Sequence, residues 1–312
     1  DVVTVGAANT LTLGAGSNTL TVTFDTSTAA DNAIDFKIDA ANAGDTITLA
    51  VTDTHGGGNT VTFADEIGGS ADGDKIDAIT LAATTVTVFT GTVNAGTITN
   101  AATATTTFNG NVTANLNFTA DGTVSVGAAV TAFAGNIDNT TGTDGAGTVN
   151  FDAAADINIT GNLGATNSLK AITTDITGNG AGANDFTGTV AATTITITGT
   201  DDTDEVTFMG DVTGNVVIVD GALITVEADK KIVGNVTADD TDGILTFETQ
   251  TADTTIVSGN IGVAGSGDLA AVNLATGAGV TTTFGGSVNA ALINVTANGT
   301  VVFTDDVTSA EL

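Results

Sequence analysis

One short phrase recurs along the chain and constrains its fold more than any other feature. It reads Phe, any residue, Gly or Asp, any residue, then Val or Ile, as in FNGNV at 108–112. Eight copies begin with Phe, and three begin with an aliphatic residue instead, one of which also ends with Leu. Recurrence at such a period is typical of folds that stack one small unit on the next. The copies begin at Phe63, Phe89, Phe108, Phe133, Ile159, Phe186, Phe208, Ile232, Val257, Phe284 and Phe303.

The phrase has the alternating period of a β-strand. Its apolar members lie two or four positions apart and therefore share one face, whereas Thr, Asn or Ser usually stands between them. The intervals between consecutive copies are uneven. We predict an all-β, elongated β-solenoid with irregular coils of about 24 residues, the mean interval between copies. The anchor side chains should point inward, with a corner or bulge close to each Gly.

The N-terminal segment 1–60 fits this repeat poorly. Its part NTLTLGAGSNTLTVTF at 9–24 alternates as a strand does, but it lacks the phrase. We therefore divide the chain into an N-terminal β segment, 1–60, and a repetitive β-solenoid, 61–312. The first is expected to be a cap or a strand-exchange element. The last copy stops within a coil, which predicts a sheet edge that either a neighbour covers or a longer precursor continues.

The strongly acidic composition excludes several classes of partner. The net charge is −31, from 36 acidic residues against 5 lysines, and there is no Arg. Nucleic acids and anionic lipid surfaces both require basic residues, so neither is expected as a partner. No stretch approaches the roughly 20 apolar residues of a membrane helix, so we expect no direct membrane insertion. The chain opens on Asp1 without a basic leader, which indicates a secreted and processed chain.

Residues that carry catalysis are scarce. The chain has no Cys, Trp or Tyr, and its single histidine, His55, stands in a Gly-rich segment. With one His and no Cys, we expect neither a zinc site nor a Cys-His or Ser-His-Asp arrangement. We therefore expect no enzyme. A pair of carboxylates is the one catalytic arrangement that the sequence leaves open.

Clustered acidic residues carry the clearest chemical signal. One cluster, GTDDTDE, contains Asp201, Asp202, Asp204 and Glu205, and a second, TADDTDG, contains Asp239, Asp240 and Asp242. Ca²⁺ takes six to eight oxygen ligands, and closely spaced carboxylates in a loop can converge on it. Neither cluster has the EF-hand spacing, and Asp is also common in ordinary turns. Two alternatives stay open, a Ca²⁺ site and solvated turns.

Several long segments resemble the repeats of large bacterial surface proteins. They are VTVFTGTVNAGTI at 86–98, TTFNGNVTANLNF at 106–118, and the stretch from Gly259 to Val307. They are most similar to the passenger repeats of rickettsial outer-membrane-protein-B-type autotransporters. That resemblance implies a β-solenoid displayed outside the cell, as a surface layer or adhesin, and it implies no catalytic residues.

Two functional classes follow from these observations. The first is an extracellular or cell-surface structural protein, whose copies assemble with one another into a layer, sheath or filament. Uniform repeats and the scarcity of catalytic residues favour it. The second is the cleaved passenger of an adhesin, which would bind through the loops that vary between coils. A recurrent aromatic or basic patch would favour the adhesin, and the sequence shows none.

Overall fold

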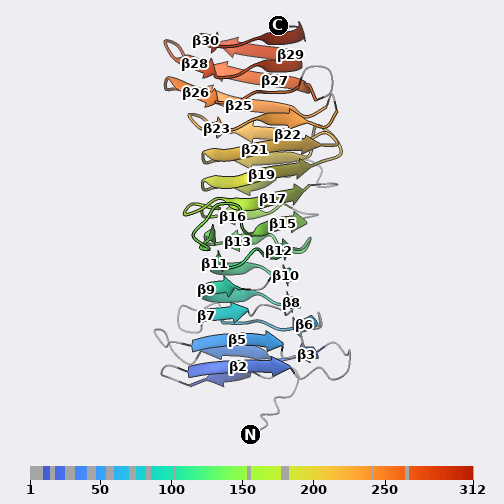
Figure 1. Cartoon of the computed structure of the whole chain (residues 1–312), viewed down its shortest axis with the longest axis vertical. Helices are drawn as coiled ribbons and strands as arrows, with labels where there is room; N and C mark the ends of the chain where they lie inside the picture. The colour runs from blue at the N-terminus through green and yellow to red at the C-terminus, as the bar shows by residue number, and fades with distance from the viewer. Residues whose placement is uncertain are drawn as a thin grey trace.

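The computed structural model is an elongated stack of short β-strands (Figure 1). It describes residues 10–14, 18–24, 32–40, 47–53, 60–69, 75–81, 86–101, 103, 105–152, 156–176, 183–240, 242–263 and 267–311. The strands are β1 (Thr10–Leu13), β2 (Asn18–Phe24), β3 (Asn32–Ile34), β4 (Lys37–Ala40), β5 (Ile47–Asp53), β6 (Thr60–Phe63), β7 (Ile76–Leu81), β8 (Val86–Phe89), β9 (Val93–Asn100), β10 (Thr105–Phe108), β11 (Val112–Phe118), β12 (Thr123–Val126), β13 (Ala132–Ala134), β14 (Ile137–Asn139), β15 (Thr148–Asp152), β16 (Asn158–Thr160), β17 (Leu169–Asp175), β18 (Ala183–Phe186), β19 (Val190–Thr198), β20 (Glu205–Phe208), β21 (Val212–Val219), β22 (Leu223–Val226), β23 (Ile232–Val233), β24 (Val236–Ala238), β25 (Ile244–Gln250), β26 (Thr254–Val257), β27 (Leu269–Thr276), β28 (Thr281–Phe284), β29 (Val288–Ala297), β30 (Thr300–Phe303) and β31 (Val307–Glu311).

Two large sheets run the length of the stack. One has 14 strands in the order β3-β6-β8-β10 and onward to β30, and the other has 15, from β2-β5-β7-β9 to β31. Neighbouring strands in both sheets are parallel, as coils that follow one another in the same direction require. No helix occurs in the described ranges. The predicted all-β, elongated β-solenoid is therefore confirmed.

Each coil passes the core three times, so inward side chains form three rows along the stack. The third row takes ten steps from Ile79 to Phe303, so the average coil there has about 22 residues, close to the size expected of one solenoid unit. The first row contains Phe63, Phe89, Phe108, Val126, Phe151, Thr174, Ile197, Ile218 and Ala238; the second contains Ile67, Val93, Val112, Phe133, Ile159, Phe186, Phe208, Val226, Phe247 and Leu274; the third contains Ile79, Ile98, Leu116, Ile137, Leu163, Val190, Val212, Ile232, Val257, Phe284 and Phe303.

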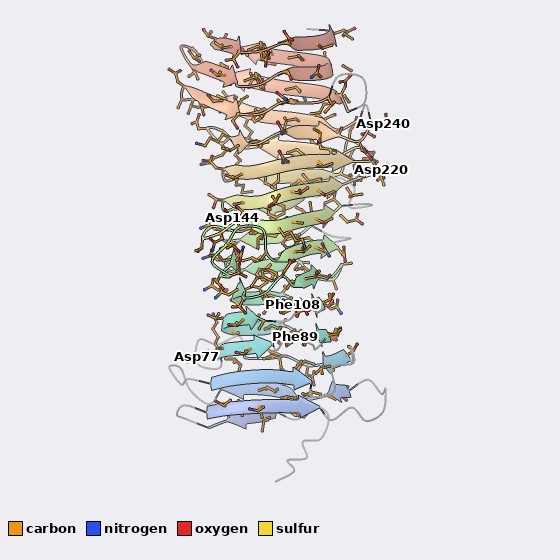
Figure 2. The ribbon with its side chains drawn as sticks, in the orientation of Figure 1. Asp77, Phe89, Phe108, Asp144, Asp220 and Asp240 are labelled. Atoms are coloured by element: carbon orange, nitrogen blue, oxygen red, sulfur yellow. The ribbon has the colours of Figure 1, made fainter. Side chains whose placement is uncertain are left out.

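The anchor residues of the phrase form the core, as predicted. Ten of the eleven are buried, and only Phe303, in the last coil, is half-buried. Phe rings of adjacent coils stack directly where the phrase repeats in register. The ring centroids of Phe63 and Phe89 are 5.1 Å apart, and those of Phe89 and Phe108 are 5.2 Å apart. Figure 2 labels Phe89 and Phe108, one above the other along the stack. Stacked rings of this kind add to the stabilisation that burial of their apolar area provides.

The phrase does not stay on one side of the solenoid. Phe63, Phe89 and Phe108 lie in the first row, but Phe133 pairs with Val112 in the second row. Val126, which begins no copy of the phrase, takes the place beside Phe108. A second move follows Phe208, because Ile232 pairs with Val212 in the third row. Neither change of row was predicted from the sequence. An i, i+2 pattern shows which side chains share a face of a strand, but it does not show which strand of the next coil they pair with.

The Gly of the phrase marks a corner where backbones of adjacent coils approach closely. A Cβ atom at Gly110 would lie 2.5 Å from the carbonyl oxygen of Gly91, well inside van der Waals contact. A Cβ atom at Gly161 would lie 2.4 Å from the carbonyl oxygen of Gly135. Gly135 and Gly161 also have φ values of 144° and 128°. Only Gly combines such a φ with so close an approach. The predicted corner at the phrase Gly is therefore confirmed.

Asn side chains at these corners join one coil to the next. The Oδ1 atom of Asn115 accepts a hydrogen bond from the Asn136 amide at 2.9 Å, and Asn136 Oδ1 accepts one from the Asn162 amide at 2.8 Å. Asn235 Oδ1 does the same for the Asn260 amide at 2.8 Å. These side chains supply acceptors at the corner, where the strand ladder is interrupted and amides would otherwise lack a partner.

The described strands of segment 1–60 extend the same sheets. β2 pairs with β5 and β5 pairs with β7, while β3 pairs with β6. β1 and β4 form a separate two-stranded sheet. The role of segment 1–60 as a cap or strand-exchange element stays a prediction.

Candidate functional site

The first predicted acidic cluster forms a turn between β19 and β20. Asp204 is buried, and its Oδ2 accepts hydrogen bonds from the amide and the hydroxyl of Thr200, both at 2.7 Å. Asp201 Oδ1 accepts from the amide and hydroxyl of Thr203 at 2.8 and 2.5 Å. These bonds hold the pKa of Asp201 below its usual range. Glu205 accepts from the hydroxyl of Thr225 at 2.6 Å, and Asp202 is exposed.

The second predicted cluster sits beside an acidic residue that the sequence did not single out. Asp220 belongs to the preceding coil, and its amide donates to Asp239 Oδ1 at 3.3 Å. Burial, followed by the charges of Asp239 and Asp240, raises the pKa of Asp242. Figure 2 shows Asp220 and Asp240 close together at one edge of the stack. The signal that could have identified Asp220 is its Asp-Gly pair, which also occurs at Asp242.

The structure brings the two clusters to the same edge. Gly221 lies between them, since a Cβ atom there would be 3.8 Å from the Cα of Asp201 and 3.7 Å from Asp242 Oδ2. Within the described residues, however, no three His, Cys, Asp or Glu side chains are gathered so that they could hold a metal ion. The carboxylates of Asp201 and Asp204 are bonded within their own turn. Ca²⁺ binding at this edge stays a prediction.

Several other acidic side chains serve as acceptors between coils. Asp144 Oδ1 accepts from the Ser168 amide at 2.7 Å, and Asp253 Oδ1 accepts from the Thr281 amide at 2.6 Å. Asp229, which has a φ of 60°, accepts from the amides of Thr251 and Ala252 at 2.7 and 2.9 Å. The bonds to Thr251 lower the pKa of Asp229. Part of the acidity therefore has a structural role at the turns.

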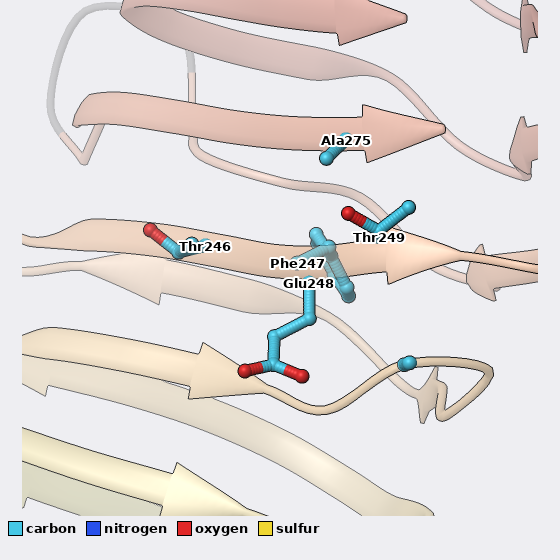
Figure 3. Close-up of a pocket in the computed structure, with 6 residues that line it drawn as sticks. Thr246, Phe247, Glu248, Thr249 and Ala275 are labelled. Atoms are coloured by element: carbon cyan, nitrogen blue, oxygen red, sulfur yellow. The ribbon is translucent and has the colours of Figure 1, made fainter. Parts of the chain in front are cut away.

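A shallow hollow of about 430 Å³ lies beside β25 (Figure 3). Its chemistry is limited to one carboxylate, Glu248, and the hydroxyls of Thr246 and Thr249. His55 lies outside the described residues, so the structure does not place it. In the described part of the chain no helix is long and apolar enough to cross a membrane.

The comparison with known proteins agrees with this architecture. The chain is 33% identical over 298 residues to outer membrane protein A of Rickettsia rickettsii, an alignment that covers 85% of this chain. The same alignment covers only 12% of the relative, so the chain spans a small part of that protein's length. No family model and no solved structure matches the chain. This relative is an A-type protein, whereas the predicted resemblance was to the B type. The predicted resemblance to repetitive rickettsial outer-membrane proteins is confirmed.

Proposed function

We propose that this chain is a non-catalytic structural segment of an extracellular or cell-surface protein. The observation that carries the proposal is the continuous solenoid, whose three rows of core residues run from coil to coil. A rod of stacked coils is suited to holding other parts of a protein at a distance and to presenting its own surface. The likeness to a rickettsial outer membrane protein supports a location at the cell surface.

Within that role we propose that copies of the chain associate end to end, as in a layer, sheath or filament. β30 and β31 are the outer strands of the two large sheets in this chain. The amides of Thr300 and Thr304 donate back to β28 and its flanks, so the amide of Val301 points away from β28. An open edge pairs readily with a strand of another molecule. Charge repulsion opposes this pairing, and salt would screen the repulsion.

Light scattering on the full chain at increasing concentration and salt tests the association. We expect the mass of the parent chain to rise, and the variant Val301→Pro to stay monomeric because it loses an edge donor. Val301→Thr keeps that amide and is the matched control, so it should associate as the parent does. A parent chain that stays monomeric under every condition contradicts self-association.

Ca²⁺ is the proposed ligand of the acidic edge formed by Asp201, Asp202, Asp204, Glu205, Asp239, Asp240 and Asp242. A cation bound only by the native state would stabilise it by about 2.7 kcal/mol at a hundred times its Kd. Melting curves in Ca²⁺ and in excess chelator test this proposal. An unchanged Tm leaves the clusters as solvated turns.

The second candidate function is the passenger of an adhesin. Loops that differ in length between coils favour it, because variable loops on a constant scaffold are common binding positions. Along the third row, the step from Ile98 to Leu116 is much shorter than the step from Leu163 to Val190. Surface display of the intact chain without self-association, together with saturable binding to host cells, would favour this function over the structural one.

A further inference from the structure

One side of the solenoid carries two outward rows without charge, although the net charge of the chain is −31. The rows lie on the strands β6, β8, β10, β12, β15, β17, β19, β21 and β24, and we call them together the Thr face. The main row, in register and half-buried throughout, is Thr62, Val88, Thr107, Ser125, Asn150, Thr173, Thr196, Val217 and Thr237. The flanking row, two residues earlier in each strand, is Thr60, Val86, Thr105, Thr123, Thr148, Ala171, Thr194 and Asn215.

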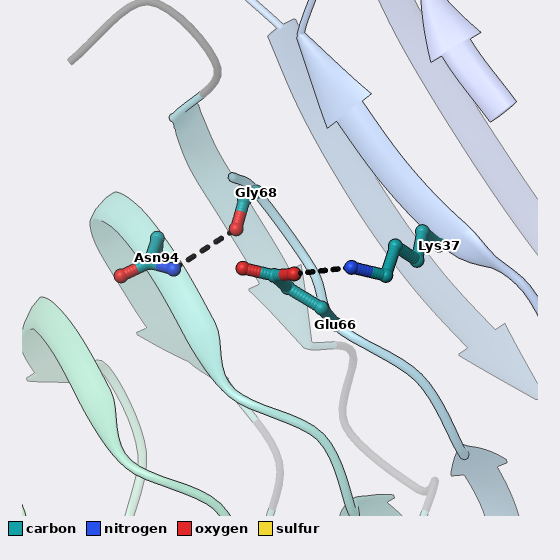
Figure 4. Close-up of polar contacts among 4 residues, drawn as sticks. All are labelled: Lys37, Glu66, Gly68 and Asn94. Carbon is teal, nitrogen blue, oxygen red and sulfur yellow. Dashed lines mark hydrogen bonds and ion pairs between the residues drawn. The ribbon is translucent and has the colours of Figure 1, made fainter. Parts of the chain in front are cut away.

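The other two sides of the solenoid carry charged groups. Beside the second row of core residues, the carboxylate of Glu66 accepts a hydrogen bond from Lys37 at 2.8 Å (Figure 4). Beside the third row, the carboxylate of Asp211 lies 3.9 Å from Lys231 Nζ. Two like-charged molecules that met through either side would bring carboxylates together, which is costly. The Thr face offers a contact area without that cost.

The main row of the Thr face reads nearly the same from both ends. Asn150 is its middle member, and four residues stand on either side. The residues at equal distances from Asn150 are Thr62 and Thr237, Val88 and Val217, Thr107 and Thr196, and Ser125 and Thr173. Each pair has the same chemistry, since Ser and Thr both carry a hydroxyl. A row of this kind is complementary to a reversed copy of itself.

We propose that the Thr face is a docking surface for a second copy of this chain, with the two solenoid axes antiparallel. A two-fold axis parallel to β15 reverses the order of the coils and leaves each row opposite itself. Val88 of one copy then lies opposite Val217 of the other, and Thr107 lies opposite Thr196. Asn150 lies opposite its own counterpart. The inference goes beyond the proposed function and does not depend on end-to-end association.

Period, charge and area all favour a second copy as the occupant. Its coils have the same spacing of about 4.8 Å, so the side chains of the two faces fit between one another along the whole length. A basic partner would be attracted to the acidic sides instead. Nine strands give a face of about 38 by 13 Å, or about 1,000 Å² over two copies, near the lower limit of specific interfaces. Single chains therefore pair transiently and keep the mass of a monomer, whereas chains joined end to end would pair through many faces at once.

Acidic residues lie at one rim of the Thr face. Asp152 and Asp175 are register partners, two positions after Asn150 and Thr173 in their strands. The two-fold arrangement places Asp152 opposite its own counterpart at this rim, where it is exposed. Charges at a rim affect mainly the association rate and its salt dependence. Pairing should therefore strengthen as salt screens this repulsion.

Thiol cross-linking of the full chain in high salt tests the pairing, because the chain has no Cys of its own and cross-links accumulate even from a transient pair. Asn150→Cys places one thiol at the two-fold axis, and a short bismaleimide should join two chains into a covalent dimer. The Val301→Pro background removes end-to-end association from the measurement. A failure to cross-link there would count against this pairing alone, whereas the light-scattering test addresses the end-to-end association.

Charges placed on the face test the predicted contacts. Thr107→Asp, added to Asn150→Cys, should lower the cross-linked yield about tenfold or more, since it buries an unpaired carboxylate opposite Thr196. Adding Thr196→Lys as well should restore the yield, because each new carboxylate then lies opposite a new ammonium group of the other copy. Within one chain the two positions are four coils apart, so they do not pair with each other.

Thr62→Cys is the matched control, since Thr62 lies in the same row and is also half-buried. Alone it should give no dimer, because the two thiols would lie at opposite ends of the paired faces. Mixed with Thr237→Cys chains, it should give a mixed dimer. The proposal is overturned if Asn150→Cys gives no dimer, if Thr62→Cys alone cross-links as well as Asn150→Cys, or if Thr196→Lys does not restore the yield.

Discussion

At the scale of single residues, the Phe anchors were predictable and the buried polar residues were not. An aromatic residue that recurs with strand period has few alternatives to a core position, and Phe89, Phe108 and Phe186 are all at most 1% exposed. Thr87 and Thr106 have the same strand period, yet both are fully buried. Thr suits either face of a strand, so the pattern alone could not place them.

Replacing Phe108 with Ala should destabilise the fold by about 3 to 5 kcal/mol, since the change leaves a cavity between Phe89 and the next coil. Denaturant unfolding measures the loss. Phe303→Ala is the matched control, because Phe303 is only half-buried, and it should cost clearly less. Equal losses would contradict the assignment of Phe108 to the continuous core.

Thr87→Val and Thr106→Val should each raise stability by about 1 kcal/mol, because each buried hydroxyl bears a desolvation cost that Val removes at similar volume. Neither hydroxyl has a hydrogen-bond partner in the described structure. Thr282→Val serves as the comparison, since its hydroxyl is bonded to that of Thr276 at 2.8 Å and its loss should destabilise. Thermal melts that rank Thr282→Val as the most stable of the three would refute this account.

At the scale of strands and turns, the sequence predicts where corners occur but not how they are connected. Gly-Asn within the phrase indicated a corner, and the hydrogen bond between Asn136 and Asn162 lies there. The contact between acidic turns of adjacent coils could not be predicted, because Asp220 and Asp239 meet only when coils of unequal length are stacked. That juxtaposition depends on the length of every coil between them, which no local pattern encodes.

Asp242→Asn should raise the Tm at pH 7 and leave it nearly unchanged at pH 3. Burial and neighbouring charges raise the folded-state pKa of Asp242, so the folded state binds its proton more tightly than the unfolded state does. The stability contributed by this group is therefore present below the unfolded pKa, about 3.9, and is lost as pH rises. Asn removes the charge that causes that loss.

Asp201→Asn is the opposite control. Hydrogen bonds from Thr203 lower the pKa of Asp201, so its contribution is present above the unfolded pKa and is lost as pH falls. This variant should lower the Tm at pH 7. A Tm at pH 7 that falls in both variants would contradict the electrostatic account of the acidic edge.

At the scale of the whole molecule, the solenoid was predictable because one phrase recurs, and the changes of side of that phrase were not. The mean phrase spacing of about 24 residues exceeds the coil average of about 22 residues along the third row, although both are sizes typical of a solenoid unit. The difference arises because the phrase advances by more than one coil where it changes side. Sequence spacing measures the repeat of the motif, whereas backbone pairing determines the repeat of the fold.

The central claim, that the phrase changes side within a continuous solenoid, is tested most directly by disulfide formation between introduced cysteines. Thr113 and Ala134 are register partners on adjacent parallel strands, at a spacing of about 4.8 Å that a disulfide spans. The variant Thr113→Cys with Ala134→Cys should therefore oxidise readily to an intramolecular disulfide. The variant Asn109→Cys with Ala134→Cys would be in register only if Phe133 stacked on Phe108, and it should stay reduced. Rapid oxidation of the Asn109 pair, with a reduced Thr113 pair, would contradict the account.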